Sequence, residues 1–134
     1  LFVGTFGGSV YGLDAETGKV AWEQRVGGMI MSSLAYSAGR VYAASSNGRL
    51  MALSSQKGKV LWQRNTGGRI KSHIVERGGF VYAAVGKRVL AFNGANGGRA
   101  WTVNLSGRLG YGLASNEQGI FAVARNGKVF RMRP

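Results

Sequence analysis

The side chains able to perform acid–base, metal or nucleophilic chemistry are few and widely separated in this sequence. Its 134 residues include one histidine, no cysteine and five carboxylates, which are Asp14, Glu16, Glu23, Glu76 and Glu117. Catalytic carboxylates act in pairs whose surroundings separate their pKa values, and a hard cation such as Ca²⁺ needs several clustered oxygens. No two of these five show a spacing typical of either arrangement. We therefore predict no catalytic residue, no metal ligand and no cofactor-binding residue in this chain.

The single histidine, His73, lies in the strand-like stretch Ile70–Val75. A catalytic triad needs a base beside a carboxylate and a nucleophile, and no spacing in the sequence indicates such a group. A metal site would need further ligands, which this chain supplies only sparsely. We interpret His73 as a hydrogen-bonded neutral imidazole.

Basic residues are far more abundant than acidic ones. The chain has 18 Lys and Arg against 5 Asp and Glu, a formal net charge of +13. Residues 1–25 carry two basic and three acidic groups, so the excess of basic groups lies in residues 26–134. Such a charge attracts polyanions, acidic proteins or anionic membrane surfaces, although a solvated basic face is the simpler interpretation. The candidate interaction residues are Arg69, Lys71, Arg108, Arg125, Lys128, Arg131 and Arg133.

An internal repeat of about 40 residues organises the sequence. The three tryptophans, Trp22, Trp62 and Trp101, are spaced by 40 and 39 residues. A strand-like apolar phrase precedes each of them at a constant distance, and a glycine step follows. Because several features share one register, we interpret each period as one structural unit that packs against its neighbours.

Each repeat is predicted to consist of strands. The apolar phrases run 5–8 residues, are rich in β-branched and aromatic residues, and end at turn residues. Gly7-Gly8, Asn47-Gly48 and Asn126-Gly127 are typical of two-residue hairpin turns. Four antiparallel strands per roughly 40 residues form a β-propeller blade, so we predict an all-β propeller fold with a little over three blades. Inner strands of a propeller line its channel, so a channel-facing His73 is the alternative to the first interpretation.

The phrase Leu13–Trp22 strongly resembles the repeat of the pyrroloquinoline-quinone-like (PQQ-like) β-propeller family. The residues of this chain that match the family motif are Asp14, Thr17, Gly18, Trp22, Gly58, Trp62, Gly97 and Trp101. The second copy has Ser54 at the Asp position, and the third has Asn93. The resemblance implies that each Trp packs between neighbouring blades and that the Asp–Thr–Gly turn leads to the outer strand. A large flat ring can fill the space between two twisted sheets, so we interpret these residues as structural.

The register of the repeat predicts the blade boundaries, with the strands of each blade named A to D from the inside outwards. Residues 1–26 supply strands C and D of a first blade, with Leu1–Phe6 as a candidate end of strand B. Residues 27–66 and 67–106 form full blades, and residues 107–134 supply strands A to C of a last blade. The resemblance implies a ring of about seven or eight blades. We therefore expect the C-terminal part of a larger propeller, or a chain that completes a ring by association.

The resemblance implies two functions from different classes. The first is a non-catalytic scaffold for protein–protein interaction, similar to the propeller lipoprotein of outer-membrane β-barrel assembly, with a periplasmic or cell-envelope location. The alternative is part of a quinoprotein dehydrogenase. The charge adds a third hypothesis, a basic propeller that binds anions or nucleic acid. We favour the scaffold.

The expected partners follow from the scaffold hypothesis and from the open ends of the repeat. We predict a protein partner or further propeller blades, and self-association through the vacant edge along Lys128–Arg133. Anionic surfaces are a further expected partner because of the net charge. No cofactor is expected, and no apolar run is long enough for an integral membrane segment.

Overall fold

Fourteen strands and no helix make up residues 1–133, the part of the chain that the computed structural model describes. The strands are β1 (Phe2–Gly4), β2 (Ser9–Leu13), β3 (Val20–Arg25), β4 (Ala35–Ser37), β5 (Arg40–Ala44), β6 (Arg49–Ser54), β7 (Val60–Asn65), β8 (Val75–Arg77), β9 (Phe80–Val85), β10 (Arg88–Asn93), β11 (Arg99–Asn104), β12 (Leu109–Asn116), β13 (Gly119–Ala124) and β14 (Val129–Met132). The predicted all-β fold is confirmed. Within these residues, no helical segment has the length and apolar character needed to cross a membrane.

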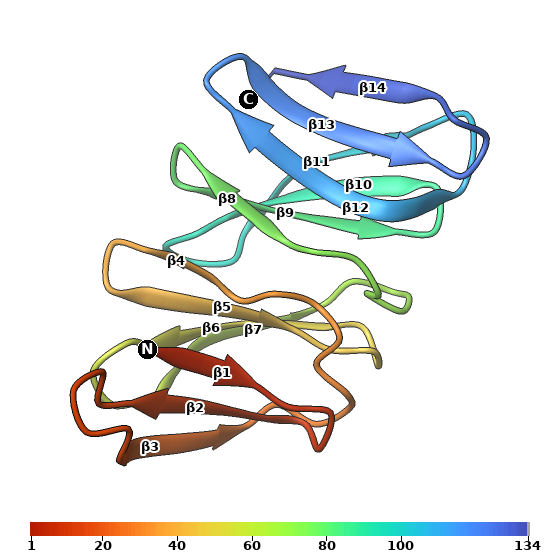
Figure 1. Ribbon diagram of the computed structural model, residues 1–134. Coiled ribbons are helices and arrows are strands. Elements are labelled where there is room, and N and C mark those ends of the chain that lie inside the picture. The colour runs from red at the N-terminus through yellow and green to blue at the C-terminus, as the bar shows by residue number, and fades with distance from the viewer. Residues whose placement is uncertain (134) are drawn as a thin grey trace.

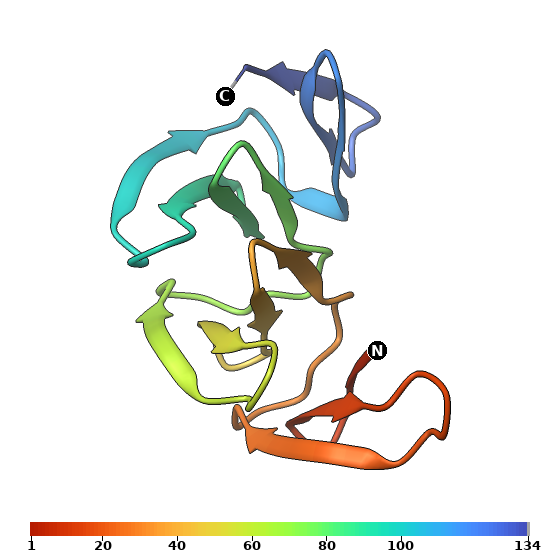
Figure 2. The same ribbon diagram turned by 90° about the vertical axis from the view of Figure 1, so that its left-hand side faces the viewer.

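The strands form four consecutive antiparallel sheets, each built from strands adjacent in sequence (Figure 1). Sheet 1 contains β1–β3, sheet 2 contains β4–β7, sheet 3 contains β8–β11 and sheet 4 contains β12–β14. Figure 2 shows the sheets following one another along an arc, with the two ends of the chain at opposite ends of the arc. The predicted partial propeller is therefore confirmed, and sheets 2 and 3 are its four-stranded blades.

Sheet 1 has one strand more than the two expected for residues 1–26. The additional strand, β1, pairs with β2 and places Phe2 opposite Gly12. It lies within the stretch Leu1–Phe6, the candidate for the end of strand B. The chain reverses between these strands in the turn Thr5–Gly8, which the Gly8 N–H closes by donating to the Thr5 oxygen at 3.1 Å, and the φ of +84° at Gly8 favours glycine there. The predicted two-residue turn at Gly7-Gly8 is therefore one residue longer than expected.

The inner strands of sheets 2 and 3 are shorter than expected, since β4 and β8 each span three residues and Ile70–Ile74 lies outside β8. The connection before β4 shows a reason. The Ile30 N–H donates to the Thr5 oxygen at 3.2 Å, so this residue bonds to a turn of sheet 1 and does not begin the inner strand of sheet 2. Leu109 bonds to the Gly86 oxygen at 2.8 Å in the same way, but it also begins β12 by pairing with Ala124.

Three apolar cores lie between successive sheets, because the middle strands are buried on both faces. Along β5, Val41 and Ala43 belong to the core shared with sheet 1, whereas Tyr42 and Ala44 belong to the core shared with sheet 3. None of these four residues is more than 1% exposed. Each sheet therefore completes its core only with both neighbours in place, as expected of a repeat protein.

The tryptophans join each sheet to the next one. Trp22 of β3 is buried, and its Nε1 donates to the Ser55 carbonyl oxygen of sheet 2 at 3.0 Å. Trp62 repeats this contact one sheet further along, with Nε1 at 2.8 Å from the Gly94 carbonyl oxygen. Trp101 is partly buried and packs on Tyr82 within the core between sheets 3 and 4.

Turn glycines make room for these rings. Gly58 and Gly97 adopt φ values of +68° and +71°. A Cβ on Gly58 would overlap the ring of Trp22, and a Cβ on Gly97 would lie 2.6 Å from Cδ2 of Trp62. Gly18 holds the same turn position in sheet 1 with φ of +72°, but no atom lies within 4 Å of its added Cβ. The three glycines thus share a backbone conformation and differ in what they touch.

We expect Gly58→Ala to destabilise the chain more than Gly18→Ala. The left-handed backbone costs either alanine about 1 kcal/mol. The overlap with Trp22 adds about 1–3 kcal/mol at Gly58 alone. Urea unfolding of both variants and the parent chain measures the difference. Equal destabilisation would show that the Trp22 ring does not press on this turn.

The turn between β2 and β3 is held by the Asp14 carboxylate. Its Oδ1 accepts hydrogen bonds from the Glu16 N–H (2.9 Å), the Thr17 N–H (2.8 Å) and the Thr17 hydroxyl (3.1 Å). These bonds, led by that of the Thr17 N–H, hold the pKa of Asp14 below its ordinary value. In sheet 3 the Asn93 side chain accepts from the Ala95 N–H at 2.9 Å, so a neutral amide can close the same turn.

Asp14→Asn is expected to reduce the loss of stability in acid. Because the pKa of Asp14 is lowered on folding, the ionised carboxylate contributes stability above the unfolded value of about 3.9. That contribution disappears as the pH falls through the lower folded value, and the variant has no such group to protonate. Unfolding curves recorded from neutral to acid pH should converge for the two chains as the pH falls. Parallel curves over the whole range would contradict this.

Candidate functional site

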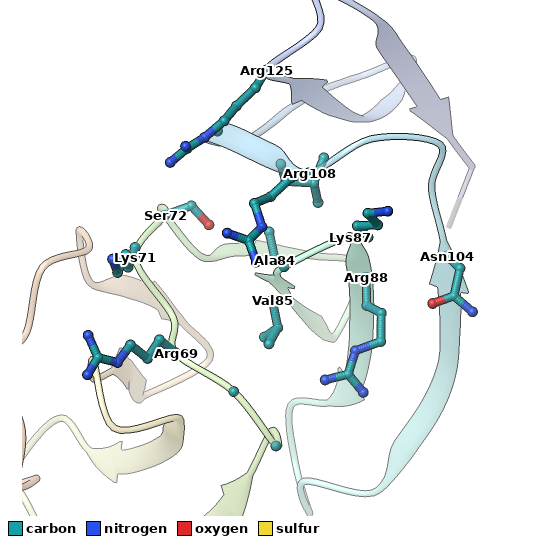
Figure 3. Close-up of a pocket in the computed structure, with 15 residues that line it drawn as sticks. Arg69, Lys71, Ser72, Ala84, Val85, Lys87, Arg88, Asn104, Arg108 and Arg125 are labelled. Carbon is teal, nitrogen blue, oxygen red and sulfur yellow. The ribbon is translucent and has the colours of Figure 1, made fainter.

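A cavity of about 620 Å³ opens between sheets 3 and 4, at the end of the molecule that carries the B–C turns and the connections between sheets. We call it the basic pocket. Its basic lining residues are Arg69, Lys71, Lys87, Arg88, Arg108 and Arg125. Figure 3 shows these side chains on several sides of the cavity. None of the residues that line it is acidic.

Backbone hydrogen bonds within and between sheets 3 and 4 hold the segments that form the basic pocket, and the bond from the Leu109 N–H to the Gly86 oxygen at 2.8 Å joins the two sheets. The Lys87 carbonyl oxygen accepts from the Leu105 N–H at 2.8 Å, which ties the β9–β10 turn to the connection between the sheets. The Arg108 carbonyl oxygen accepts from the Arg125 N–H at 2.9 Å, which ties the same connection to the end of β13. Three segments distant in sequence are therefore held together by the main chain.

Alternation around buried residues directs basic side chains outwards. Ile70 is fully buried, so its neighbours Arg69 and Lys71 point away from the core and line the pocket. In sheet 4, Leu109 packs on the core at the equivalent position, and Arg108 precedes it as Arg69 precedes Ile70. The same local pattern thus supplies an arginine from each sheet.

Gly110 allows Arg125 to reach the pocket. A Cβ on Gly110 would lie 2.5 Å from Cγ of Arg125, so the arginine side chain passes directly over the glycine. In sheet 3 the equivalent position is Lys71. Sheet 3 therefore contributes a cation from the connection itself, whereas sheet 4 contributes one from its B–C turn.

The pocket cations differ in their hydrogen bonds from Arg49, Arg64, Arg77 and Arg131, whose side chains donate to main-chain oxygens. Outside the pocket, Arg64 donates to the Gly97 carbonyl oxygen at 2.9 Å, and Arg77 donates to the Glu117 carbonyl oxygen at 2.9 Å. Across residues 1–133, no side-chain hydrogen bond joins the six pocket cations to a protein acceptor. Their donors, up to five on each guanidinium and three on each ammonium, face the cavity or solvent.

The carboxylates lie away from the basic pocket. Glu23 of sheet 1 accepts from the hydroxyls of Ser9 and Tyr11 at 2.8 and 3.1 Å. Glu76 accepts from the Gly79 N–H at 3.0 Å in the A–B turn of sheet 3. Glu76 lies at the other end of the strands from the B–C turns, and Glu23 lies in sheet 1, so neither carboxylate lines the pocket between sheets 3 and 4.

The structure brings together four of the seven basic residues that the sequence singled out. Arg69, Lys71, Arg108 and Arg125 line the one cavity. The other three, Lys128, Arg131 and Arg133, do not line it and lie on or beside β14, an edge strand of sheet 4. The pairing of another strand along this edge stays a prediction.

Lys87 and Arg88 were not among the candidates, although both line the pocket. The repeat contained a signal for Arg88, because Arg88 occupies the position that Arg49 occupies in the preceding repeat. Arg88 faces Asn104 across β10 and β11, as Arg49 faces Asn65 across β6 and β7. Lys87 lies in the shortened turn of the third copy, and no local pattern indicates where that turn points.

His73 lies in the connection before β8, and its side chain is exposed. Its Nδ1 accepts a hydrogen bond from the Ser33 N–H at 3.1 Å. The backbone N of His73 lies 3.4 Å from the position of a Cβ added to Gly112. Ser33, His73 and Gly112 are equivalent positions of three repeats, so the hydrogen-bonded imidazole links adjacent inner segments of the propeller.

The residues of this chain do not fit a calcium–quinone centre. Within residues 1–133, no three His, Cys, Asp or Glu side chains come close enough to hold a metal ion. The basic pocket is lined by cations, whereas Ca²⁺ requires several oxygen ligands.

Comparison with known sequences shows the family. A sequence profile of the family described as outer membrane protein assembly factor BamB matches residues 1–90, more than half of the chain. The chain belongs to this family. The PQQ-like repeat predicted from the sequence is confirmed by the same match. No curated protein is similar enough in sequence to count as a relative.

Solved structures share the fold of this BamB-family chain. BamB from Moraxella catarrhalis matches with a TM-score of 0.82 and 20% identity, over 96% of this chain and 41% of that one. A europium-containing methanol dehydrogenase matches with a TM-score of 0.67 and 19% identity, over 81% of this chain and 23% of that one. Quinohemoprotein alcohol dehydrogenase from Comamonas testosteroni matches with a TM-score of 0.66 and 23% identity, over 77% of this chain and 19% of that one. This chain thus spans about two fifths of the BamB structure, and these identities show the fold alone.

Proposed function

We propose that this chain is part of a non-catalytic scaffold that binds a protein partner in outer-membrane β-barrel protein assembly. Membership of a family described as an outer-membrane assembly factor supports this role. The repeat tryptophans and glycines are occupied in packing sheet on sheet, so binding falls to residues of the turns and connections. The observation that carries the proposal is an exposed apolar surface on the turns of sheets 1 and 2.

This surface, which we call the apolar turn surface, consists of Phe6, Met29 and Met31. Their side chains are 73%, 48% and 43% exposed. The hydrogen bond from the Ile30 N–H to the Thr5 oxygen joins the two segments that carry them. Exposed apolar patches mark interaction sites, and aromatic and methionine side chains are enriched at protein interfaces. A protein with complementary apolar side chains suits this surface.

The rival hypothesis is that the chain is part of a quinoprotein dehydrogenase. Its support is the propeller fold shared with two solved dehydrogenases. The lack of fit to a calcium–quinone centre weighs against it. An assay that reports both barrel assembly and alcohol oxidation separates the two hypotheses.

We expect Met29→Ser combined with Met31→Ser to lower the amount of folded β-barrel protein in the outer membrane several-fold, because serine removes the apolar contact area. The measurement is heat-modifiable migration of barrel proteins from cells whose only copy of this protein carries the changes. The matched control is Val20→Ser combined with Leu61→Ser, which removes two exposed apolar residues from the outer strands β3 and β7.

The control should leave the barrel proteins at the parental amount, and thermal unfolding should be unchanged for both variants. Parental amounts in the Met29 and Met31 variant would contradict the proposed surface. Deletion of the gene separates the two hypotheses. If the deletion leaves the amount of barrel proteins normal but abolishes dye-linked alcohol oxidation, the dehydrogenase hypothesis is favoured.

A further inference from the structure

We infer that the basic pocket between sheets 3 and 4 is a binding site for a compact ligand that carries two or more phosphate groups. This inference concerns a different surface from the apolar turn surface and does not depend on the proposed function. It rests on the six cations that line one cavity, on the lack of protein acceptors for them, and on the size of the cavity.

The repeat shows that the fold does not need these cations. Arg69 and Lys71 occupy the positions that Met29 and Met31 occupy 40 residues earlier. Both connections follow a glycine pair and flank a buried isoleucine, so their backbones serve the same packing role. Methionines fill these positions in the second repeat with the same backbone packing. The packing of the third repeat therefore does not require cations there.

The charge of the pocket favours a bound anion. Six like charges around one cavity repel one another, and no lining carboxylate offsets them. Four arginines outside the pocket, namely Arg49, Arg64, Arg77 and Arg131, donate to main-chain oxygens, as Arg49 does to the Val26 oxygen at 3.2 Å. The pocket donors instead have only solvent or a ligand to bind. An anion in the cavity would both reduce the repulsion and satisfy these donors.

The geometry favours phosphate groups on a compact molecule. The cations come from the segments 69–71, 87–88, 108 and 125, and Figure 3 shows them around the cavity rather than along a groove. A strand of nucleic acid needs an extended basic track with stacking platforms, which this arrangement does not provide. The volume of about 620 Å³ is that of a small-molecule site and exceeds the space for one phosphate.

Phosphate matches the donors better than carboxylate does. A guanidinium fork pairs with two phosphate oxygens, and four of the six cations are arginines. A phosphate monoester carries a charge of about −1.5 to −2 on three acceptor oxygens, so it can be approached from several directions at once. Such groups occur both on free phosphorylated molecules and on lipid headgroups, and the same pocket chemistry would recognise either.

Titration calorimetry with tripolyphosphate at physiological salt tests the site. We expect saturable binding of one tripolyphosphate per chain, with weaker binding of sulfate and citrate. Arg69→Met combined with Lys71→Met, which copies the residues of the preceding repeat, should weaken binding about tenfold or more. The matched control, Lys57→Met combined with Lys59→Met, removes the same charge from an exposed turn at the other end of the molecule and should change affinity less than about twofold.

Equal weakening by the two variants would overturn the inference, because it would show a general effect of net charge. Tighter binding of hexaglutamate or citrate than of tripolyphosphate would also overturn it, in favour of an acidic protein or a carboxylate ligand. Vesicles of phosphatidylcholine with and without phosphatidic acid distinguish the sources of phosphate. Vesicle binding that tripolyphosphate displaces supports a headgroup in the pocket, whereas vesicle binding that it does not displace, with no saturable tripolyphosphate binding, contradicts the site.

Discussion

The contact of a tryptophan ring with the next sheet is the interaction on which the rest of the structure depends. The middle strands bury both faces, so no sheet has a complete core of its own. Trp22 and Trp62 close the outer part of each interface, and each Nε1 donates to a carbonyl oxygen of the next C–D turn. Leaving such a buried donor without a partner costs about 1–3 kcal/mol, so the ring also determines where the next turn lies.

This packing divides the repeat into two kinds of position. The tryptophans and the turn glycines recur because the interface between sheets recurs. The residues beside the core positions Ile30, Ile70 and Leu109 change in identity from methionine to arginine, lysine or glycine along the chain. The repeat thus presents different side chains on one constant framework, which allows neighbouring blades to bind different ligands.

The direction of the strands determines at which end of the molecule each turn lies. In an antiparallel sheet the A–B and C–D turns lie at one end of the strands, and the B–C turns and connections lie at the other. Asp14, Glu76 and Glu117 belong to the first end, whereas the basic pocket belongs to the second. The apolar turn surface also lies at the second end, on the turns of sheets 1 and 2. Both candidate binding surfaces therefore share one end of the propeller, and the other end is closed by short polar turns.

The sequence by itself determined the blade and its strands. The spacing of Trp22, Trp62 and Trp101 and the glycine turns encode local structure with a fixed period, so the fold could be predicted from neighbouring residues alone. It also indicated Arg69, Lys71, Arg108 and Arg125 as separate basic residues, but not that they share a cavity. Only the tertiary structure decided this, because strand pairing joins Arg108 with Arg125 and Leu105 with Lys87, and the bond from the Leu109 N–H to the Gly86 oxygen joins sheet 4 to sheet 3. The short strand β4 has a related cause, since the connection before it bonds to sheet 1 through Ile30 and Thr5, and no periodicity within a single strand reports such a bond.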